Sequence, residues 1–117
     1  MRVAHLSQTD AGAGAGRAAR RIHRSLLAMG VDSCMIVGEK RTTDATILPA
    51  FRSPASRFIA RICQYFEAKA SRQGLAAQHY FFSPARFGYF KPAHHRHVQA
   101  ADVLCLYWIN GGFITPE

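Results

Sequence analysis

The sequence is poor in acidic side chains and contains no long apolar run. Its 117 residues include seven Asp and Glu against fifteen Lys and Arg, which gives a formal net charge of +8. A surface of this sign attracts phosphorylated ligands, anionic lipid or nucleic acid, and charge alone does not choose among them. Hydrophobic residues make up 49% of the chain, which excludes intrinsic disorder. The absence of an apolar stretch of about 18 residues excludes a membrane-spanning helix and predicts a soluble or at most peripheral protein.

The sequence also has only three cysteines and does not show the pattern of a secretion signal. Cys34, Cys63 and Cys105 are odd in number, widely spaced and surrounded by apolar residues. This pattern is unlike a disulfide framework or a CxxC metal or redox site, so we expect three small core residues. Met1 leads almost directly into an apolar strand pattern, without the basic and apolar regions of a signal peptide. The sequence therefore predicts a cytoplasmic protein.

The apolar periodicity predicts an α/β fold, with a Rossmann-like parallel sheet and flanking helices. Residues 2–8 and 33–38 are short apolar runs typical of buried parallel strands, and residues 17–29 have a helical spacing that stops at Gly30. Because a helix connects the two strands, we expect them to be parallel. The other expected elements are a short strand at 46–48, a helix that starts at Pro54 with Ser53 as its N-cap, an irregular connection at 79–97, a strand at 103–108 and a helix that opens at Thr115.

Each of the two long predicted helices has an apolar face that we expect to be buried. On the first helix this face comprises Ala18, Ala19, Ile22, Leu26 and Met29. On the second helix it comprises Ile59, Ile62, Cys63, Phe66 and Ala70. The basic residues of both helices fall mainly elsewhere on the helical wheel, which predicts that they face solvent.

A glycine-rich loop follows the first predicted strand, in the stretch TDAGAGAGR of residues 9–17. Gly12, Gly14 and Gly16 let the backbone approach a ligand closely, and free amides at a helix N-terminus favour anions such as phosphate. The Gly-Lys-Ser/Thr ending of a phosphate-binding loop is absent. The looser GxGxxA pattern of dinucleotide sites fits, and Glu39 stands where a ribose-binding acid would. A protein that binds a nicotinamide dinucleotide is one alternative, and glycines that only pack the helix on the strand are another.

Three stretches of the sequence together resemble the N-terminal domain of family 4 glycosyltransferases. They are RVAHLSQTDAGAGAGRAARRIHRSLLAMGVDSCMIVG at residues 2–38, FFSPARFG at 81–88 and ADVLCLYWINGGFITPE at 101–117. The resemblance implies a retaining enzyme of the GT-B architecture, in which two Rossmann-like domains face each other across a cleft. Such an enzyme moves a sugar from a nucleotide diphosphate sugar to a glycan or lipid-linked acceptor and needs no further cofactor. The resemblance also implies that residues 1–117 form an incomplete N-terminal domain, which lacks the C-terminal donor domain and is inactive alone.

The resemblance implies roles for two groups of residues. Contacts with the donor diphosphate or the acceptor fall to Asp10, Gly12, Gly14, Gly16 and Arg17. The acceptor wall, which follows the last strand, falls to Tyr107, Trp108, Asn110 and Gly111. Where the family pattern reads Leu-His-Trp, this sequence has Tyr107, which can donate a hydrogen bond but is not an imidazole. The catalytic residue therefore stays unassigned.

The histidines favour structural roles over chemistry. His94, His95 and His97 have no acid or cysteine at the usual spacing of metal ligands, which predicts a solvated loop and no metal site. His5 lies in a predicted buried strand and His23 on the first basic helix. We expect both to be hydrogen-bonded structural histidines rather than catalysts.

Two further surfaces leave alternatives open. The arginines of the two helices suggest peripheral contact with anionic lipid, at the inner face of a membrane. Core or cleft packing explains the aromatic cluster better than a nucleic-acid surface does, and this cluster comprises Phe81, Phe82, Phe87, Tyr89 and Phe90. A noncatalytic basic binding module remains an alternative function, with no specific nucleic-acid partner expected.

Overall fold

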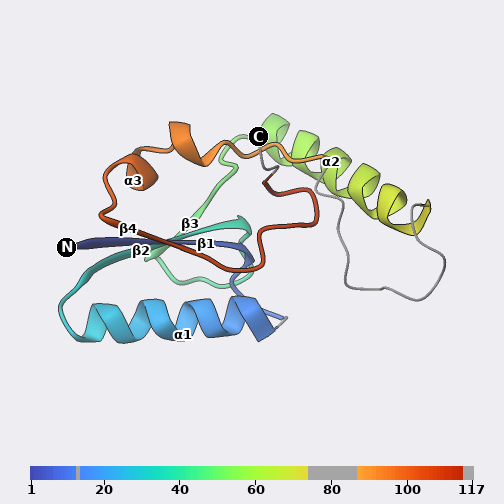
Figure 1. Cartoon of the computed structure of the whole chain (residues 1–117). Helices are drawn as coiled ribbons and strands as arrows, with labels where there is room; N and C mark the ends of the chain where they lie inside the picture. Colours follow the sequence, from blue (N-terminus) through green and yellow to red (C-terminus); the bar gives the residue numbers. More distant parts are fainter. Residues whose placement is uncertain (13, 74–86, 115–117) are drawn as a thin grey trace. The chain divides into compact units, whose positions relative to one another are not determined.

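The computed structural model describes residues 1–12, 14–73 and 87–114 of the chain, which is drawn in Figure 1. The chain divides into two compact units. The first unit comprises Met1–Ala50 and Lys91–Ile109, and the second comprises Phe51–Phe90 and Asn110–Glu117. The sheet belongs to the first unit, and a 20-residue helix belongs to the second.

The first unit is built on a four-stranded sheet in which every strand pair is parallel. The strand order is β3-β2-β1-β4, and the strands are β1 (Arg2–Thr9), β2 (Asp32–Glu39), β3 (Ile47–Pro49) and β4 (Val103–Leu106). The register places His5 of β1 between Met35 of β2 and Cys105 of β4. This topology confirms the predicted α/β fold with a parallel, Rossmann-like sheet.

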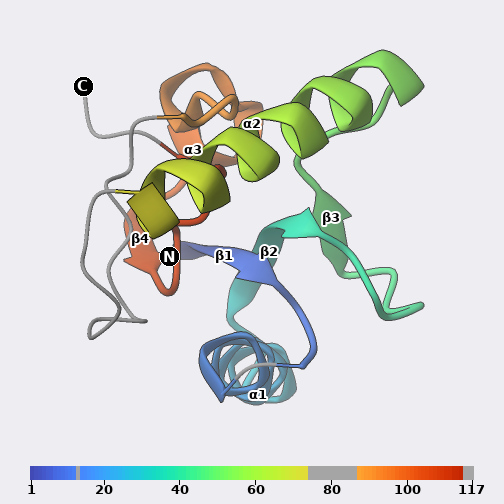
Figure 2. The ribbon, with the colours of Figure 1, turned by 90° about the vertical axis from the view of Figure 1, so that its right-hand side faces the viewer.

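Helices lie on both sides of this sheet. Helix α1 (Gly14–Ala28) connects β1 to β2 and lies along one face of the sheet, as Figure 2 shows end-on. The short helices η1 (Pro92–His94) and α3 (Arg96–Gln99) precede β4, and α3 lies on the side opposite α1 in Figures 1 and 2. The first helix is confirmed but starts at Gly14 rather than at residue 17. The connection expected to be irregular contains η1 in its described part, because Pro92 is pre-set for a helical turn.

The buried face of α1 differs from the predicted one. The helix buries Gly16, Ala19 and His23, whereas Ile22 and Met29 are 46% and 69% exposed. Small side chains let the helix approach the sheet closely, and His23 is accommodated because it finds hydrogen-bond partners beneath the helix. The contact face is therefore rotated away from the predicted apolar stripe, of which Ala19 is the fully buried member.

One core cluster of the first unit lies between α1 and the sheet. Ala19 of α1 packs with Met35 and Val37 of β2 and with Ile47 of β3, and all four are fully buried. Tyr107, which follows β4, packs against this cluster. Helix α1 and the strands β2 and β3 thus supply this cluster.

The second unit combines helix α2 (Pro54–Gln73) with an aromatic cluster. The Ser53 hydroxyl accepts an amide N–H from the first turn of α2, which confirms the predicted helix start. Phe90 stacks on Phe113 with ring centroids 5.1 Å apart, and both side chains are buried. Phe51 meets both rings edge-on. Core packing is therefore confirmed for Phe90.

The predicted apolar face of α2 is wrong as a buried face. Ala60 and Glu67 are the buried residues of the helix, whereas Ile59, Ile62 and Phe66 are exposed. The fully buried contacts of the helix with its unit are made by small and polar side chains, and its large apolar side chains stay partly exposed. This inverted arrangement is unusual for a helix of a globular protein, which normally buries its apolar stripe.

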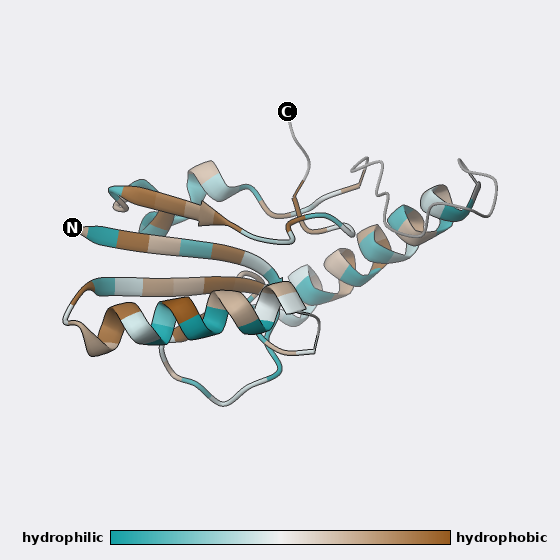
Figure 3. Ribbon diagram, turned by 60° about the horizontal axis from the view of Figure 1, so that its bottom comes forward, coloured by the Kyte–Doolittle hydropathy of each residue, from teal (hydrophilic) through white to brown (hydrophobic). Residues whose placement is uncertain are grey.

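Strand β4 is also more exposed than the sequence suggests. It forms one edge of the sheet, and its Val103, Leu104 and Leu106 side chains are exposed. Figure 3 shows the strand as apolar along its length. The strand ends at Leu106, before the predicted end at residue 108, although the Tyr107 amide still donates to the carbonyl of Leu6 at 2.9 Å.

Three further expectations concern the cysteines and residues outside the described part of the chain. The cysteines Cys34, Cys63 and Cys105 are free and half-buried, so they are less buried than the expected core residues. The predicted helix at Thr115 lies outside the described residues. The predicted packing of Phe81 and Phe82 lies outside them as well.

Candidate functional site

The candidate site is the edge of the first unit's sheet at which the parallel strands end. Because the strands are parallel, β1, β2 and β4 all end at this edge, where open α/β sheets bind their ligands. Strand β1 leads into Asp10 and the glycine loop, β2 ends at Glu39, and β4 leads into Tyr107 and Trp108. The structure thus brings three loops with functional candidates to one edge of the sheet.

The three glycines of the loop have different structural roles. Gly12 has a φ of +90°, a conformation that residues with a side chain rarely adopt. A Cβ on Gly16 would lie 2.4 Å from the carbonyl oxygen of Thr9, so α1 sits directly against the end of β1. A Cβ on Gly14 would meet no atom within 4 Å. The packing interpretation therefore explains Gly16, whereas Gly12 shapes the loop and Gly14 leaves open space at the start of α1.

Asp10 is buried and ties the loop after β1 to the loop after β2. Its carboxylate accepts hydrogen bonds from the Arg41 amide at 2.7 Å, from the Thr42 amide at 3.0 Å and from the Thr42 hydroxyl. Burial works to raise the pKa of Asp10, but these hydrogen bonds outweigh it and hold the pKa below its usual range. The ionised carboxylate is thus a clamp that fixes the backbone on both sides of the candidate site.

Two arginines are candidates for binding an anion at the glycine loop. Arg17 is exposed in the first turn of α1, and it has no ion-pair partner in the part of the chain that the structure describes. Nη1 of Arg41 lies 3.2 Å from the position that a Cβ of Gly12 would occupy. Guanidinium groups and helix N-terminal amides are the groups with which proteins hold phosphate oxygens. The arrangement can therefore bind an anion beside the glycines.

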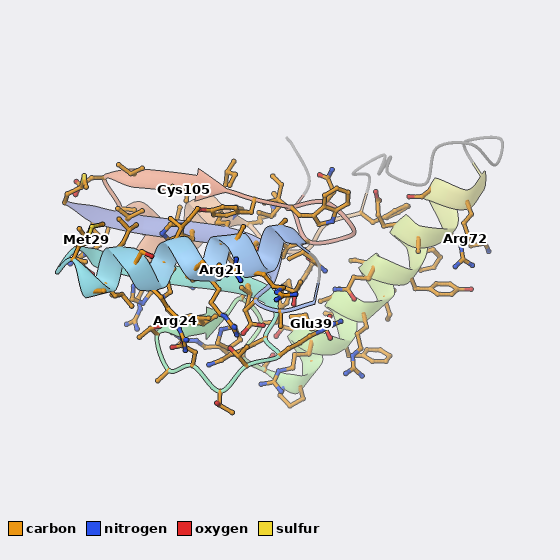
Figure 4. The ribbon with its side chains drawn as sticks, turned by 90° about the horizontal axis from the view of Figure 1, so that it is seen from below. Arg21, Arg24, Met29, Glu39, Arg72 and Cys105 are labelled. Carbon is orange, nitrogen blue, oxygen red and sulfur yellow. The ribbon has the colours of Figure 1, made fainter. Side chains whose placement is uncertain are left out.

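Glu39, the candidate ribose-binding acid, already has a partner. Its Oε2 accepts a hydrogen bond from Nη2 of Arg41 at 3.0 Å, and both side chains are about half exposed. Figure 4 shows Glu39 at the end of β2, with Arg21 and Arg24 along the solvent side of α1. A dinucleotide ribose would have to displace the arginine to reach the carboxylate, which makes the dinucleotide reading less favourable.

Tyr107 and Trp108 differ in accessibility. The Tyr107 hydroxyl lies 3.1 Å from Nδ1 of His5, and its ring packs on the core beneath α1. Burial, with a contribution from Cys105, raises the pKa of Tyr107, so the phenol stays neutral. Trp108, the chain's single tryptophan, is 46% exposed. Of these two predicted wall residues, Trp108 is the one that a ligand in solvent can reach directly.

His5 and His23 form a buried pair beneath α1, with ring centroids 5.8 Å apart. The two ring nitrogens of His23 lie 2.8 Å from the Ser33 hydroxyl and 2.9 Å from the Thr46 hydroxyl, and His5 is bonded to Tyr107. Both histidines are therefore hydrogen-bonded, as expected, and their structural rather than catalytic role stays a prediction. Burial and the neighbouring His23 lower the pKa of His5 to about 4, and burial also lowers the pKa of His23.

The other predicted site residues lie in the second unit. Asn110 and Gly111 start a turn that continues into Gly112, and both glycines have a positive φ. A Cβ on Gly112 would lie 2.7 Å from the Cα atom of Gln64, so this turn packs closely on α2. The acceptor-wall role of Asn110 and Gly111 stays a prediction.

The sequence did not single out Arg41 and Thr42. They fall in a stretch that reads as a polar loop, and Lys40 beside Arg41 is the only local signal of a charged site there. Their importance comes from Asp10, which binds both backbone amides across 31 and 32 positions of sequence. A contact of that separation depends on the parallel pairing of β1 with β2 and has no local signature.

Comparisons with family models, with curated proteins and with solved structures found no match for this chain. Among the described residues, no group of three or more potential metal ligands lies close together. No helix in that part of the chain has the length and the apolar character that crossing a bilayer requires. A function therefore has to be argued from the geometry of the site and from the sequence resemblance.

Proposed function

We propose that this chain is the N-terminal part of a glycosyltransferase, which moves a sugar from a nucleotide diphosphate donor to a glycan or lipid-linked acceptor. One observation carries the proposal. Gly12, Arg17 and Arg41 surround the start of α1 at the edge of a parallel sheet where the strands end. The loop resembles that of family 4 glycosyltransferases, and this resemblance suggests that the anion is the diphosphate of the sugar donor or a phosphate of the acceptor.

The chemistry of sugar transfer explains why such a site is useful. The bond between the sugar C1 and the diphosphate breaks while an acceptor hydroxyl oxygen bonds to C1, so negative charge accumulates on the departing diphosphate, which takes up the proton that the hydroxyl loses. Fixed amides and guanidinium groups stabilise that charge. Asp10 holds the Arg41 backbone in place, and Arg17 adds a second positive group from α1. The exposed indole of Trp108 offers an apolar face on which a sugar ring can stack.

A titration with inorganic pyrophosphate, followed by backbone amide NMR, tests the anion site. We expect the largest shifts at the amides of Gly12, Gly14 and Gly16. Arg17→Gln should weaken binding about tenfold, since it removes one charged hydrogen-bond donor. The matched control Arg21→Gln, which removes the same charge from the solvent side of α1, should bind as the wild type does. Shifts centred elsewhere, or equal weakening in both variants, would contradict the proposal.

The dinucleotide alternative has its own test. A nicotinamide-dinucleotide protein should bind NAD with an affinity that Glu39→Ala changes, because the acid would hold the ribose. Our proposal predicts no such dependence, since Glu39 is paired with Arg41 in the structure. Saturable NAD binding that is lost in Glu39→Ala would favour the alternative.

A further inference from the structure

Helix α2 leaves its large apolar side chains partly exposed to solvent. Phe58, Ile62, Tyr65 and Phe66 lie on one side of the helix, because their spacing of four, seven and eight residues follows its turn. Phe58 is 66% exposed and Tyr65 is 64% exposed. Ile59 beside them is exposed as well. We call these five residues the apolar face of α2.

The apolar face extends beyond the helix through aromatic contacts. The rings of Tyr65 and Phe66 are 5.7 Å apart, and the rings of Phe66 and Phe87 are 5.8 Å apart. Phe87 is itself 40% exposed. Isolated exposed apolar residues are common on protein surfaces, but a contiguous group of this kind indicates an interaction surface.

Basic side chains border the apolar face, and no exposed acid of the described second unit opposes them. Arg61 precedes Tyr65 by one helical turn, and Lys69 follows it by one turn. Arg72 extends from the last turn of α2, as Figure 4 shows. The one acid in the described part of the second unit is Glu67, which is 1% exposed and accepts the amide N–H of Phe87 at 3.1 Å. The surface of α2 is therefore cationic as well as apolar.

We propose that α2 docks on an anionic phospholipid bilayer. Its aromatic and aliphatic side chains would enter the boundary between headgroups and acyl chains, while Arg61, Lys69 and Arg72 contact the lipid phosphates. Long basic side chains reach the headgroup level while their stems cover apolar surface. An apolar stripe bordered by unopposed cations is the pattern of helices that lie in a membrane interface. The inference rests on α2 alone and is independent of the proposed function.

Sedimentation with lipid vesicles tests this docking. The folded chain is mixed with vesicles of phosphatidylcholine alone or with about 30% phosphatidylglycerol, which sets the negative surface potential. We expect binding to the anionic vesicles and much less to the neutral ones. High salt should weaken the anionic binding, because it screens the attraction between lysine, arginine and phosphate.

Paired variants separate the two parts of the surface. The double variant Phe58→Ser and Tyr65→Ser should lower partitioning at least tenfold, and both positions are exposed enough for the fold to tolerate the change. Arg61→Gln with Arg72→Gln should lower it about 30-fold. The matched control Arg20→Gln with Arg21→Gln removes two charges from α1 and should leave partitioning within about threefold of the wild type.

Other occupants of the surface would give different results. Equal binding to neutral and anionic vesicles, or unchanged binding of both α2 variants, would overturn the proposal. A stable dimer that fails to bind vesicles and dissociates in Phe58→Ser with Tyr65→Ser would show that a second copy covers the apolar face instead. Vesicle binding is measured without any nucleotide, so its failure leaves the pyrophosphate titration unaffected.

Discussion

Acidification to pH 5 should destabilise the folded chain through His5. The ordinary pKa of 6.5 applies in the unfolded chain, whereas burial and His23 lower the pKa to about 4 in the folded one. Between these pH values the unfolded chain binds more protons at His5 than the folded chain does. The contribution of His5 to stability is therefore fully present above about pH 6.5 and is lost as the pH falls toward 4. Nε2 of His5 is buried without a partner among the described residues, so a proton there would lack an acceptor.

The size of the effect follows from the gap between the two pKa values. At about 1.4 kcal/mol for each pKa unit, the full loss is about 3.5 kcal/mol, of which about 2 kcal/mol is lost between pH 7 and pH 5. His23, whose pKa is also lowered by burial, acts in the same direction. Asp10 also has a lowered pKa, so its own contribution is lost only at lower pH.

Urea unfolding at the two pH values measures this loss. His5→Asn should lower stability at pH 7 and should also reduce the difference between pH 7 and pH 5 by about 2 kcal/mol. The control His94→Asn changes an exposed histidine in η1 and should leave that difference unchanged. The reasoning would be refuted by wild-type stability that is equal at both pH values, or by an equal pH dependence in His5→Asn.

Three further predictions concern the backbone of the two units. Gly16→Ala should destabilise the chain by about 1 to 3 kcal/mol, because its Cβ would meet Thr9 at 2.4 Å, whereas Gly14→Ala should be neutral or stabilising in thermal unfolding. Asp10→Ala should cost about 2 to 3 kcal/mol of stability, because it leaves the amide donors of the loop after β2 unpaired. The amide resonances of that loop should broaden, and unchanged resonances would contradict the proposed role of Asp10 as a clamp. Gly112→Ala should lower the unfolding temperature by several degrees, since its φ of +82° and the nearby α2 backbone both oppose a side chain; an unchanged temperature would count against this packing.

The regular elements of the sheet could be predicted because their signals are local. Short apolar runs separated by a helix of crossover length give parallel strands, and Ser53 before Pro54 marks the start of α2. The buried faces of the helices could not be predicted from apolar spacing. On α1 the contact with the sheet depends on close approach at Gly16 and on partners for His23, and neither requirement appears in a hydrophobic pattern.

Some residues of the candidate site could be predicted from the sequence, and others could not. The glycine loop and Arg17 were visible in the sequence because the loop follows a strand and opens a helix. Arg41 was not visible, since it reaches Gly12 and Asp10 through the pairing of β1 with β2. The pairing of Tyr107 with His5 joins residues 102 positions apart and likewise has no local signal.

The most direct test of the proposed function is a titration with nucleotide diphosphate sugars that carry uridine, guanosine or adenosine. The fluorescence of Trp108, the chain's single tryptophan, and the amide resonances of Gly12 and Gly16 report on the two sides of the proposed site. We predict that at least one of these donors changes both signals and that inorganic pyrophosphate competes with it. No response of the glycine amides to any donor or to inorganic pyrophosphate, or NAD binding that depends on Glu39 in its place, would contradict the assignment as a glycosyltransferase domain.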